Sequence, residues 1–361
     1  MIDKLLTGLT RIFVQQMLSG ILCKKILTDL LRKIHISCLL LVTITYSYGQ
    51  DTALNYIVKD SAIETIGQQL NAPTSEKIIY PVNKSRRWII AGLHAAFWTG
   101  SYIALDKTWY SNYPRSSFHF FNDNNEWEQM DKMGHVWTAY NLGRASAELW
   151  SWSGLPRKRS VVYGGLSAIA YQSIIEIQDG FSSEWGFSWG DMTANIAGAA
   201  AYVSQELGWK DQCIQIKMSY WPYGYSPDLI ARRNQLFGAG PIERTLKDYN
   251  SQTYWISANL KSFFSKSNLP AWLNVSIGYS ADGMLGGVEN RWTDKQGNYF
   301  DRTNIPRVRR FFISPDIDLT KIKTHSKLLK TIFFTLNILK IPAPAIELNS
   351  KGKMVGHIFY Y

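Results

Sequence analysis

The chain has 361 residues, which is enough for one large domain or two smaller ones. Hydrophobic residues make up 46% of it, but a mean hydropathy of -0.16 excludes a protein that is mostly membrane helix. The formal net charge is +11, and the scattered basic residues belong to no helix-turn-helix, zinc-finger or RNA-binding signature, so no nucleic acid partner is expected. Beyond general solubility, this charge favours an anionic surface of membrane lipid or lipopolysaccharide as partner.

Residues 1–49 predict a signal peptide. Basic residues precede an apolar run, and Ser47 and Gly49 have the spacing of a signal-peptidase site. We expect cleavage before Gln50 and export to the cell envelope, either to the periplasm or to the outer membrane, with an amphipathic N-terminal anchor as the alternative. Cys38 lies inside the apolar run in a poor lipobox, so we do not expect a lipoprotein.

Residues 50–85 predict a polar linker with one short helix near Ala62–Leu70. The first apolar helix follows at Trp88–Leu105, which has 18 residues without a formal charge and meets the minimum length of a membrane span. His94 is its one titratable group. We expect this histidine to be a satisfied core residue rather than a ligand.

Three more helices are predicted before the pattern changes. His135–Trp150 is amphipathic, whereas Val161–Ile177 and Asp191–Leu207 are rich in small residues that allow close helix packing. With the first apolar helix they make a membrane-associated bundle of about four helices over residues 86–208. This bundle is either embedded in the membrane or a buried core beside it.

The remaining chain, residues 209–361, changes from helical to alternating periodicity. Apolar and polar residues alternate in four segments, and alternation is typical of strands. The strand candidates are Tyr254–Leu260, Trp272–Ser280, Arg309–Ile313 and Val355–Tyr361. An amphipathic helix is predicted among them at Lys327–Leu339. Four or five strands indicate an open antiparallel sheet beside the helices, so the predicted fold class is α+β.

Polar residues recur at one end of each of the last three helices. In each helix the acidic, amide or imidazole residues are three or four positions apart, so a helix places them on one face. In an apolar bundle such groups must meet one another, water or an ion, because isolated buried charges are too costly. One lysine among them can neutralise one carboxylate. The predicted cluster consists of Asp131, Lys132, His135, Glu176, Asp179, Asp191 and Asn195.

The stretches DKMGHVWTAYNLGRASAE and IIEIQDGFSSEWGFSWGDMTANIAGA, in this order, resemble the YfiM-like predicted periplasmic family, a domain of unknown function. The resemblance covers roughly residues 85–205. The later stretches LKDYNSQTYWISANL and WLNVSIGYSADGMLGG resemble the second half typical of the Bacteroidota branch of that family. More distantly, the acidic and histidine motifs are similar to those of the VanZ-like membrane family. These resemblances imply an envelope protein with a shared polar cluster and supply no reaction.

Three functions are open for the cluster. The first is structural or accessory: the polar residues satisfy one another and lock the bundle at the envelope membrane. The second is catalytic: a divalent ion held by imidazole and carboxylates activates water against a phosphate ester or lipid-linked sugar, or His135 acts as general base with Asp131 fixing its tautomer. The third is lipid or small-molecule binding, with the tryptophan-rich loop 181–190 as the lip of a cavity. The sequence identifies no cofactor, metal or protein partner.

Overall fold

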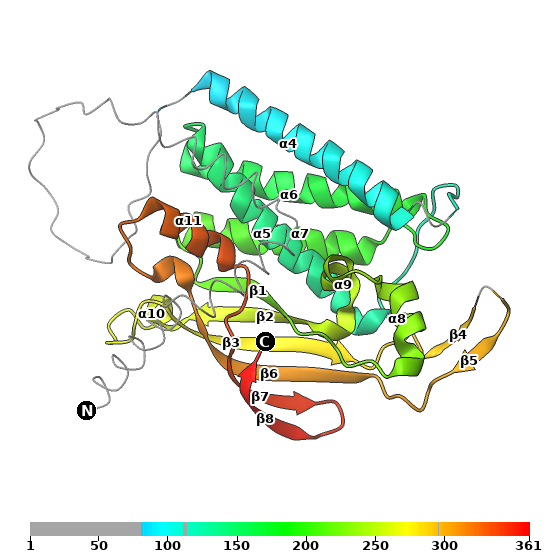
Figure 1. The fold of residues 1–361 in the computed structure, drawn as a ribbon. Helices are drawn as coiled ribbons and strands as arrows, with labels where there is room; N and C mark the ends of the chain where they lie inside the picture. The colour runs from blue at the N-terminus through cyan, green and yellow to red at the C-terminus, as the bar shows by residue number, and fades with distance from the viewer. Residues whose placement is uncertain (1–80, 82, 111–113, 295) are drawn as a thin grey trace, which may run out of the picture.

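The computed structural model describes residues 81, 83–110, 114–294 and 296–361. The predicted signal peptide and the short helix near Ala62–Leu70 lie outside the described residues. The fold class is α+β, as predicted, with a helical part followed by a strand-rich part (Figure 1). The four long helices are α4 (Lys84–Leu105), α5 (Met130–Trp152), α6 (Arg157–Gly180) and α7 (Trp189–Gly208).

Helices α5, α6 and α7 pack against one another, and α4 lies along the outer side of this group (Figure 1). The start of α4 is tied to the end of α5 by a hydrogen bond from Asn83 N to Ser153 O of 3.1 Å. His94 on α4 is buried, and its two ring nitrogens bond Ile90 O at 2.9 Å and Ser146 Oγ at 3.2 Å. The prediction of a satisfied core histidine is therefore confirmed.

Small residues set the spacing of the three central helices. A Cβ on Gly164 of α6 would lie 2.5 Å from Gly143 O of α5. A Cβ on Gly198 of α7 would lie 2.3 Å from Val136 O of α5. The backbones approach so closely at these two points that a side chain cannot fit between them.

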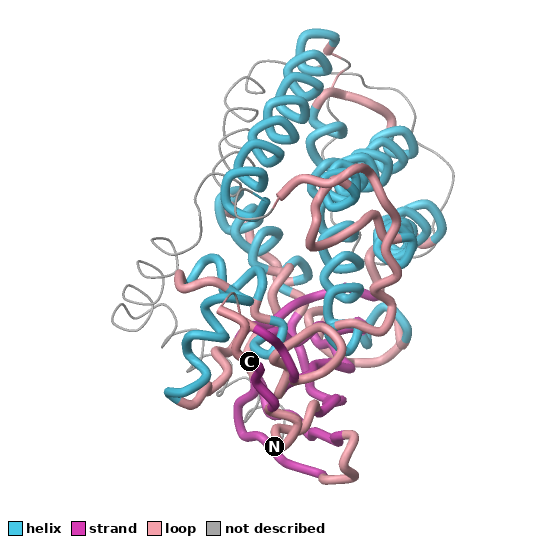
Figure 2. Tube along the Cα trace, turned by 90° about the vertical axis from the view of Figure 1, so that its right-hand side faces the viewer, coloured by secondary structure: helices cyan, strands magenta, loops and turns pink. Residues whose placement is uncertain are grey.

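Six strands form one antiparallel sheet in the order β1-β2-β3-β6-β7-β8, and two short strands form a separate hairpin. Alternation predicts four of the six sheet strands correctly. The other two, β1 and β7, are not predicted. The strands are β1 (Ile214–Tyr220), β2 (Gln252–Asn259), β3 (Leu273–Asp282), β4 (Arg291–Thr293), β5 (Tyr299–Asp301), β6 (Val308–Ile317), β7 (Ala343–Asn349) and β8 (Met354–Tyr360). Figure 2 shows the long helices in one half of the molecule and the strands, with the short helices beside them, in the other.

Short helices connect the strands. They are α8 (Ile230–Phe237), α9 (Pro241–Lys247), α10 (Leu260–Phe263) and α11 (Lys327–Leu336). The predicted helix at Lys327–Leu339 is confirmed as α11, which ends three residues early. It ends there because the following segment pairs with the free edge of β1, where Met218 N donates to Ile338 O at 3.1 Å and Lys340 N to Met218 O at 2.9 Å.

The helical and strand parts share a core at the start of α5. Met130 of α5 is fully buried against Met218 of β1, Tyr254 of β2 and Met284 after β3. Since these residues come from both parts, the first turn of α5 is held by the sheet as well as by the other helices.

Three successive residues before α5 adopt the left-handed backbone region. Trp127, Glu128 and Gln129 have φ values of 49°, 51° and 61°. Non-glycine residues rarely adopt this region, so surrounding contacts must hold the turn. The carboxylate of Glu128 pairs with Arg307 Nε at 2.8 Å and Arg309 Nε at 2.7 Å, which ties the turn to β6.

Gly198→Ala is expected to destabilise the protein, because its Cβ would clash with Val136 O and force α5 and α7 apart. We expect the free energy of unfolding to fall by about 1–3 kcal/mol. Gly92→Ala on α4 is the matched control: its Cβ would meet nothing within 4 Å, and alanine favours a helix by up to about 1 kcal/mol over glycine. Denaturant unfolding of both variants measures the difference, and equal stabilities would contradict this packing.

Candidate functional site

Lys132 lies among three carboxylates. Its Nζ is 2.6 Å from Asp123 Oδ1, 2.8 Å from Asp191 Oδ1 and 3.3 Å from Asp131 Oδ2, and its side chain is 11% exposed. The carboxylates come from the loop before α5, the first turn of α5 and the first turn of α7. Burial alone lowers the pKa of Lys132, but the three carboxylates together raise that pKa above its usual range, so the ammonium stays charged.

His135 lies one turn further along α5, and its Nδ1 faces two amide side chains, with Gln172 Nε2 at 3.4 Å. Its Nδ1 is 3.0 Å from Asn195 Oδ1, which is an acceptor and also receives a hydrogen bond of 3.0 Å from Gln172 Nε2. In the tautomer that donates to Asn195 Oδ1, the ring proton is on Nδ1. Nε2 is left with its lone pair, and it lies 3.7 Å from both Asp131 Oδ1 and Asp191 Oδ1.

Asp131 and Asp191 differ in their electrostatic surroundings. Burial alone would raise the pKa of Asp131, but His135 and Lys132 lower it below its usual value, and Tyr249 OH donates to Asp131 Oδ1 at 2.7 Å. Asp191 is almost fully buried, and burial together with the neighbouring charge of Asp131 raises its pKa. Asp131 is thus the ionised member of the pair and Asp191 the member that favours a proton or another cation.

Glu176 lies on the other side of the His135 ring. Its Oε1 is 3.6 Å from His135 Nδ1 and has no hydrogen-bond partner among the described residues, while Oε2 accepts from Ser188 N at 3.4 Å. The side chain is 1% exposed. Burial, together with the charges of Asp179 and Asp131, raises the pKa of Glu176 to about 9, so this acid keeps its proton at neutral pH.

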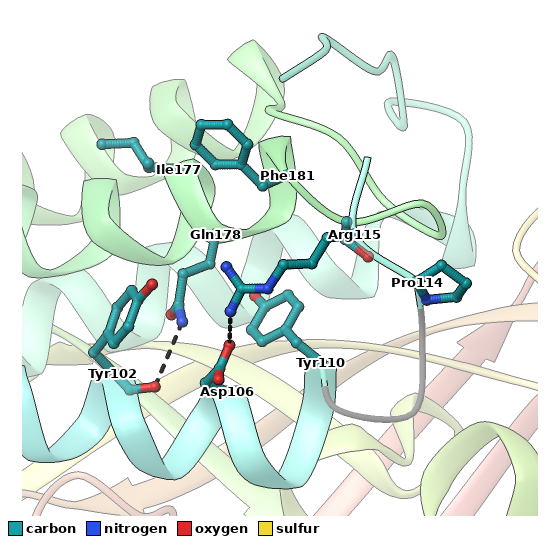
Figure 3. A pocket seen from close by; sticks show the side chains of 9 residues that line it. Tyr102, Asp106, Tyr110, Pro114, Arg115, Ile177, Gln178 and Phe181 are labelled. Carbon is teal, nitrogen blue, oxygen red and sulfur yellow. Dashed lines mark hydrogen bonds and ion pairs between the residues drawn. The ribbon is translucent and has the colours of Figure 1, made fainter. Parts of the chain in front are cut away.

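Asp179 lies beside the cluster rather than in it. Its carboxylate accepts from Tyr110 OH at 2.6 Å, and burial raises its pKa to about 7. Tyr110 lines a pocket of about 210 Å³ between the ends of α4 and α6, where Arg115 pairs with Asp106 at 2.6 Å and Gln178 bonds the backbone of α4 (Figure 3). No predicted cluster residue lines this pocket, so the cluster is a separate feature.

Three further residues contribute to the cluster without being among the predicted ones. Asp123 lies in the polar stretch eight residues before DKMGH, and no spacing in the sequence singles it out. Gln172 is four residues before Glu176 and therefore shares its helix face. Tyr249 comes 118 residues after its partner Asp131, and no local pattern singles it out.

One family model, described as "Predicted periplasmic lipoprotein (DUF2279)", matches residues 119–205. This span includes all seven predicted cluster residues. The match supports an envelope domain of unknown function, and the protein is exported and associated with the cell envelope. The matched span does not include Cys38, which lies outside the described residues. No curated protein and no solved structure matches the chain.

The free energy of unfolding is expected to fall as the pH rises towards 7, in part through Asp179. Its pKa is raised from an ordinary 3.8 to about 7 in the folded chain, so the folded state keeps a proton that the unfolded chain has lost. This stabilisation is complete below the ordinary pKa and is lost as the pH rises through the folded value. Asp179→Asn leaves an acceptor for Tyr110 and removes the titration. Denaturant unfolding across this range should therefore show a flatter profile for the variant, and parallel profiles would refute the assignment.

Proposed function

We propose that the cluster binds one divalent cation through His135 Nε2, Asp131 Oδ1 and Asp191 Oδ1. The observation behind this proposal is the convergence of three electron-pair donors, which lie within 4.8 Å of one another while the ring proton is on Nδ1. The two nitrogen–oxygen separations of 3.7 Å suit ligands about 2.1 Å from a shared ion. One imidazole with carboxylate oxygens is a donor set that suits Zn²⁺ or Mn²⁺.

The balance of charge supports the same proposal. Asp123, Asp131 and Asp191 contribute up to three negative charges, and Lys132 contributes one positive charge. A divalent ion would supply the two positive charges that are missing, in a place where uncompensated charge is costly. The hydrogen bond from His135 Nδ1 to an amide oxygen is also the kind of outer contact that orients histidine ligands.

A cation in this position would lower the pKa of a bound water and polarise a phosphoryl oxygen. We therefore propose a hydrolase of the cell envelope, acting on a phosphate ester or a lipid-linked sugar. In this reaction Asn195 and Gln172 would keep His135 in its tautomer, and Tyr249 would orient Asp131. Lys132 would hold Asp191 in place through the Oδ1 atom that also faces the imidazole.

A structural role is the second candidate, and one contact favours it. Tyr249 belongs to the strand-rich part, and its hydroxyl reaches Asp131 at 2.7 Å. The cluster therefore connects the helices to the rest of the chain. In this role the acids and Lys132 would stabilise the fold without any ion.

A lipid substrate would approach past the loop 181–190. Trp189 in this loop is 66% exposed and stacks on Phe120 with ring centroids 6.2 Å apart. We propose that lipid binds to this aromatic surface. The surface would then form the entrance to the binding site, as in the lipid-binding hypothesis drawn from the sequence.

Metal analysis of the purified full-length protein tests the ion. We expect about one divalent ion per chain, and a loss of affinity of at least about tenfold in His135→Gln and in Asp191→Asn. Asp179→Asn is the matched control, since it removes a buried acid outside the ligand set and should keep the ion. Melting temperatures with Zn²⁺, with Mn²⁺ and with a chelator give a second readout.

An ion-free wild type whose melting temperature does not respond to any of these additions would refute the metal proposal. An ion lost equally in the Asp179→Asn control would show that the ligand set is wrong. Release of phosphate from lipid phosphates in mixed micelles, present in wild type and absent from a folded Asp191→Asn, would establish the hydrolase.

Tyr249→Phe tests the structural candidate. It removes the hydroxyl that donates to Asp131, and a lost hydrogen bond to a charged group should lower the free energy of unfolding by about 1.5–3 kcal/mol. Tyr299→Phe is the control, because that side chain is 65% exposed and should change stability by less than about 0.5 kcal/mol. If the two variants have the same free energy of unfolding, the contact between Tyr249 and Asp131 does not stabilise the fold.

A further inference from the structure

A row of isoleucines crosses the face of the sheet that packs on the helices at its β1 edge, where Ile216 contacts the helix core and Tyr254 contacts Met130 of α5. Beyond this contact the face is exposed. The register aligns one isoleucine from each of β1, β2, β3, β6 and β7: Ile216, Ile256, Ile277, Ile313 and Ile346. The last four are 51–62% exposed. In the next row Tyr279, Phe311 and Leu348 are aligned in the same way. Among the described residues on this face of β2, β3, β6 and β7, Arg309 near the start of β6 is the one charged residue.

The opposite face of the same strands is buried and combines an apolar cluster of Trp255, Phe312 and Ala345 with polar side chains. Ser257, Ser276 and Ser314 are partners in the register and are at most 2% exposed. Lys217 Nζ pairs with Asp316 Oδ2 at 2.8 Å, and both side chains are fully buried. A sheet with one face in water normally directs its apolar side chains to the core and its polar ones outward. The sheet described here departs from this arrangement, because four isoleucines are exposed while the serine row and the ion pair are buried.

The outer sides of the helices are uncharged as well. Helix α4 is long and apolar enough to span a membrane, and only 6% of that window is buried. The exposed residues between Val162 and Ile177 of α6, among them Leu166, and between Thr193 and Leu207 of α7, among them Ile196, include no charged side chain. The uncharged stretch of α4 has 18 residues and is about 27 Å long, close to the roughly 30 Å of a bilayer core.

Charges gather at both ends of this uncharged surface. At one end Arg157 pairs with Glu206 and Lys321 pairs with Asp211, which brings α6, α7 and the segment after β6 together. Around these pairs the exposed charged residues are all basic: Lys84, Lys158, Arg159, Lys210, Lys266, Lys323, Lys327 and Lys330. The first turns of α5 and α7, and with them the cluster, lie at the other end, where acids and bases are mixed.

We propose that a lipid bilayer surrounds the chain at this surface. Its hydrocarbon covers residues 88–105 of α4, 160–175 of α6, 192–207 of α7 and the isoleucine row of β2, β3, β6 and β7. The basic end lies among anionic head groups of one leaflet, because eight exposed cations without an exposed acid complement that charge. The cluster lies at the head-group level of the other leaflet. The edge strand β8 is not part of this surface, because hydrocarbon cannot form hydrogen bonds with the unpaired backbone groups at its edge.

The location in the bilayer can be measured with nitroxide labels on single cysteines. The full-length protein, with Cys23, Cys38 and Cys213 replaced by serine, is reconstituted into vesicles of phosphatidylethanolamine and phosphatidylglycerol. Labels are placed at Ile277→Cys, Ile313→Cys, Leu166→Cys and Ile196→Cys. Val288→Cys and Leu246→Cys are the matched controls, because both side chains are apolar and more than half exposed but lie near the cluster end. Collisions with oxygen and with a water-soluble nickel chelate are compared.

The four surface labels should collide severalfold more with oxygen than with nickel, and the two controls should show the reverse. Equal nickel accessibility at all six positions would overturn the proposal. Spin–spin broadening at Ile277→Cys and Ile313→Cys that disappears on dilution with unlabelled protein would show a second copy on the sheet, and would overturn the sheet part of the proposal. The measurement does not depend on the metal, so its failure and the failure of the proposed function are distinguishable.

Discussion

The ammonium group of Lys132 is the constraint on which the rest of the site depends. It is nearly withdrawn from water and meets carboxylates from three separate segments at 2.6–3.3 Å. Removing a cation from such a place would leave several acids close together in a medium that screens them poorly. The loop before α5 and the first turns of α5 and α7 must therefore stay together for as long as Lys132 is buried. The left-handed backbone at residues 127–129 fits this view. The turn before α5 fixes where the helix begins, and the contact with Lys132 fixes the Asp131 carboxylate.

The properties of His135 follow from that constraint. With Asp131 and Asp191 fixed around Lys132, Asp131 directs its other oxygen, Oδ1, to within 3.7 Å of His135 Nε2. Asp191 Oδ1, the atom that contacts Lys132, lies at the same distance from Nε2. Asn195 holds the ring proton on the opposite nitrogen. Three electron-pair donors then point into one small volume.

The sequence predicts much of this site because its residues lie at helical spacing. A period of three to four residues places Asp131 with His135, and Asp191 with Asn195, on single faces. The same rule fails for Asp179, because three residues on from Glu176 a helix has turned by about 300°, and that difference is enough to direct the carboxylate to Tyr110 instead. Contacts between distant segments, such as that of Tyr249, follow from the packing of the whole chain and leave no local pattern.

The strands show a different limit. Alternation predicts which residues share a face, and the register confirms it for the segments found. In β1 the apolar–polar alternation is present, but Lys217 in its middle resembles a surface residue, and in β7 Pro344 weakens the strand pattern.

Alternation also cannot tell which face of the sheet is buried, because that depends on the solvent around the sheet. Four residues of the isoleucine row are exposed and the Lys217–Asp316 pair is fully buried, which is the observation behind our proposal of an apolar medium around the sheet. The same surroundings would account for α4, which is apolar along its length and has little protein around it. A cluster of acids at the margin of such a medium is where a head-group phosphate and a cation would both be within reach.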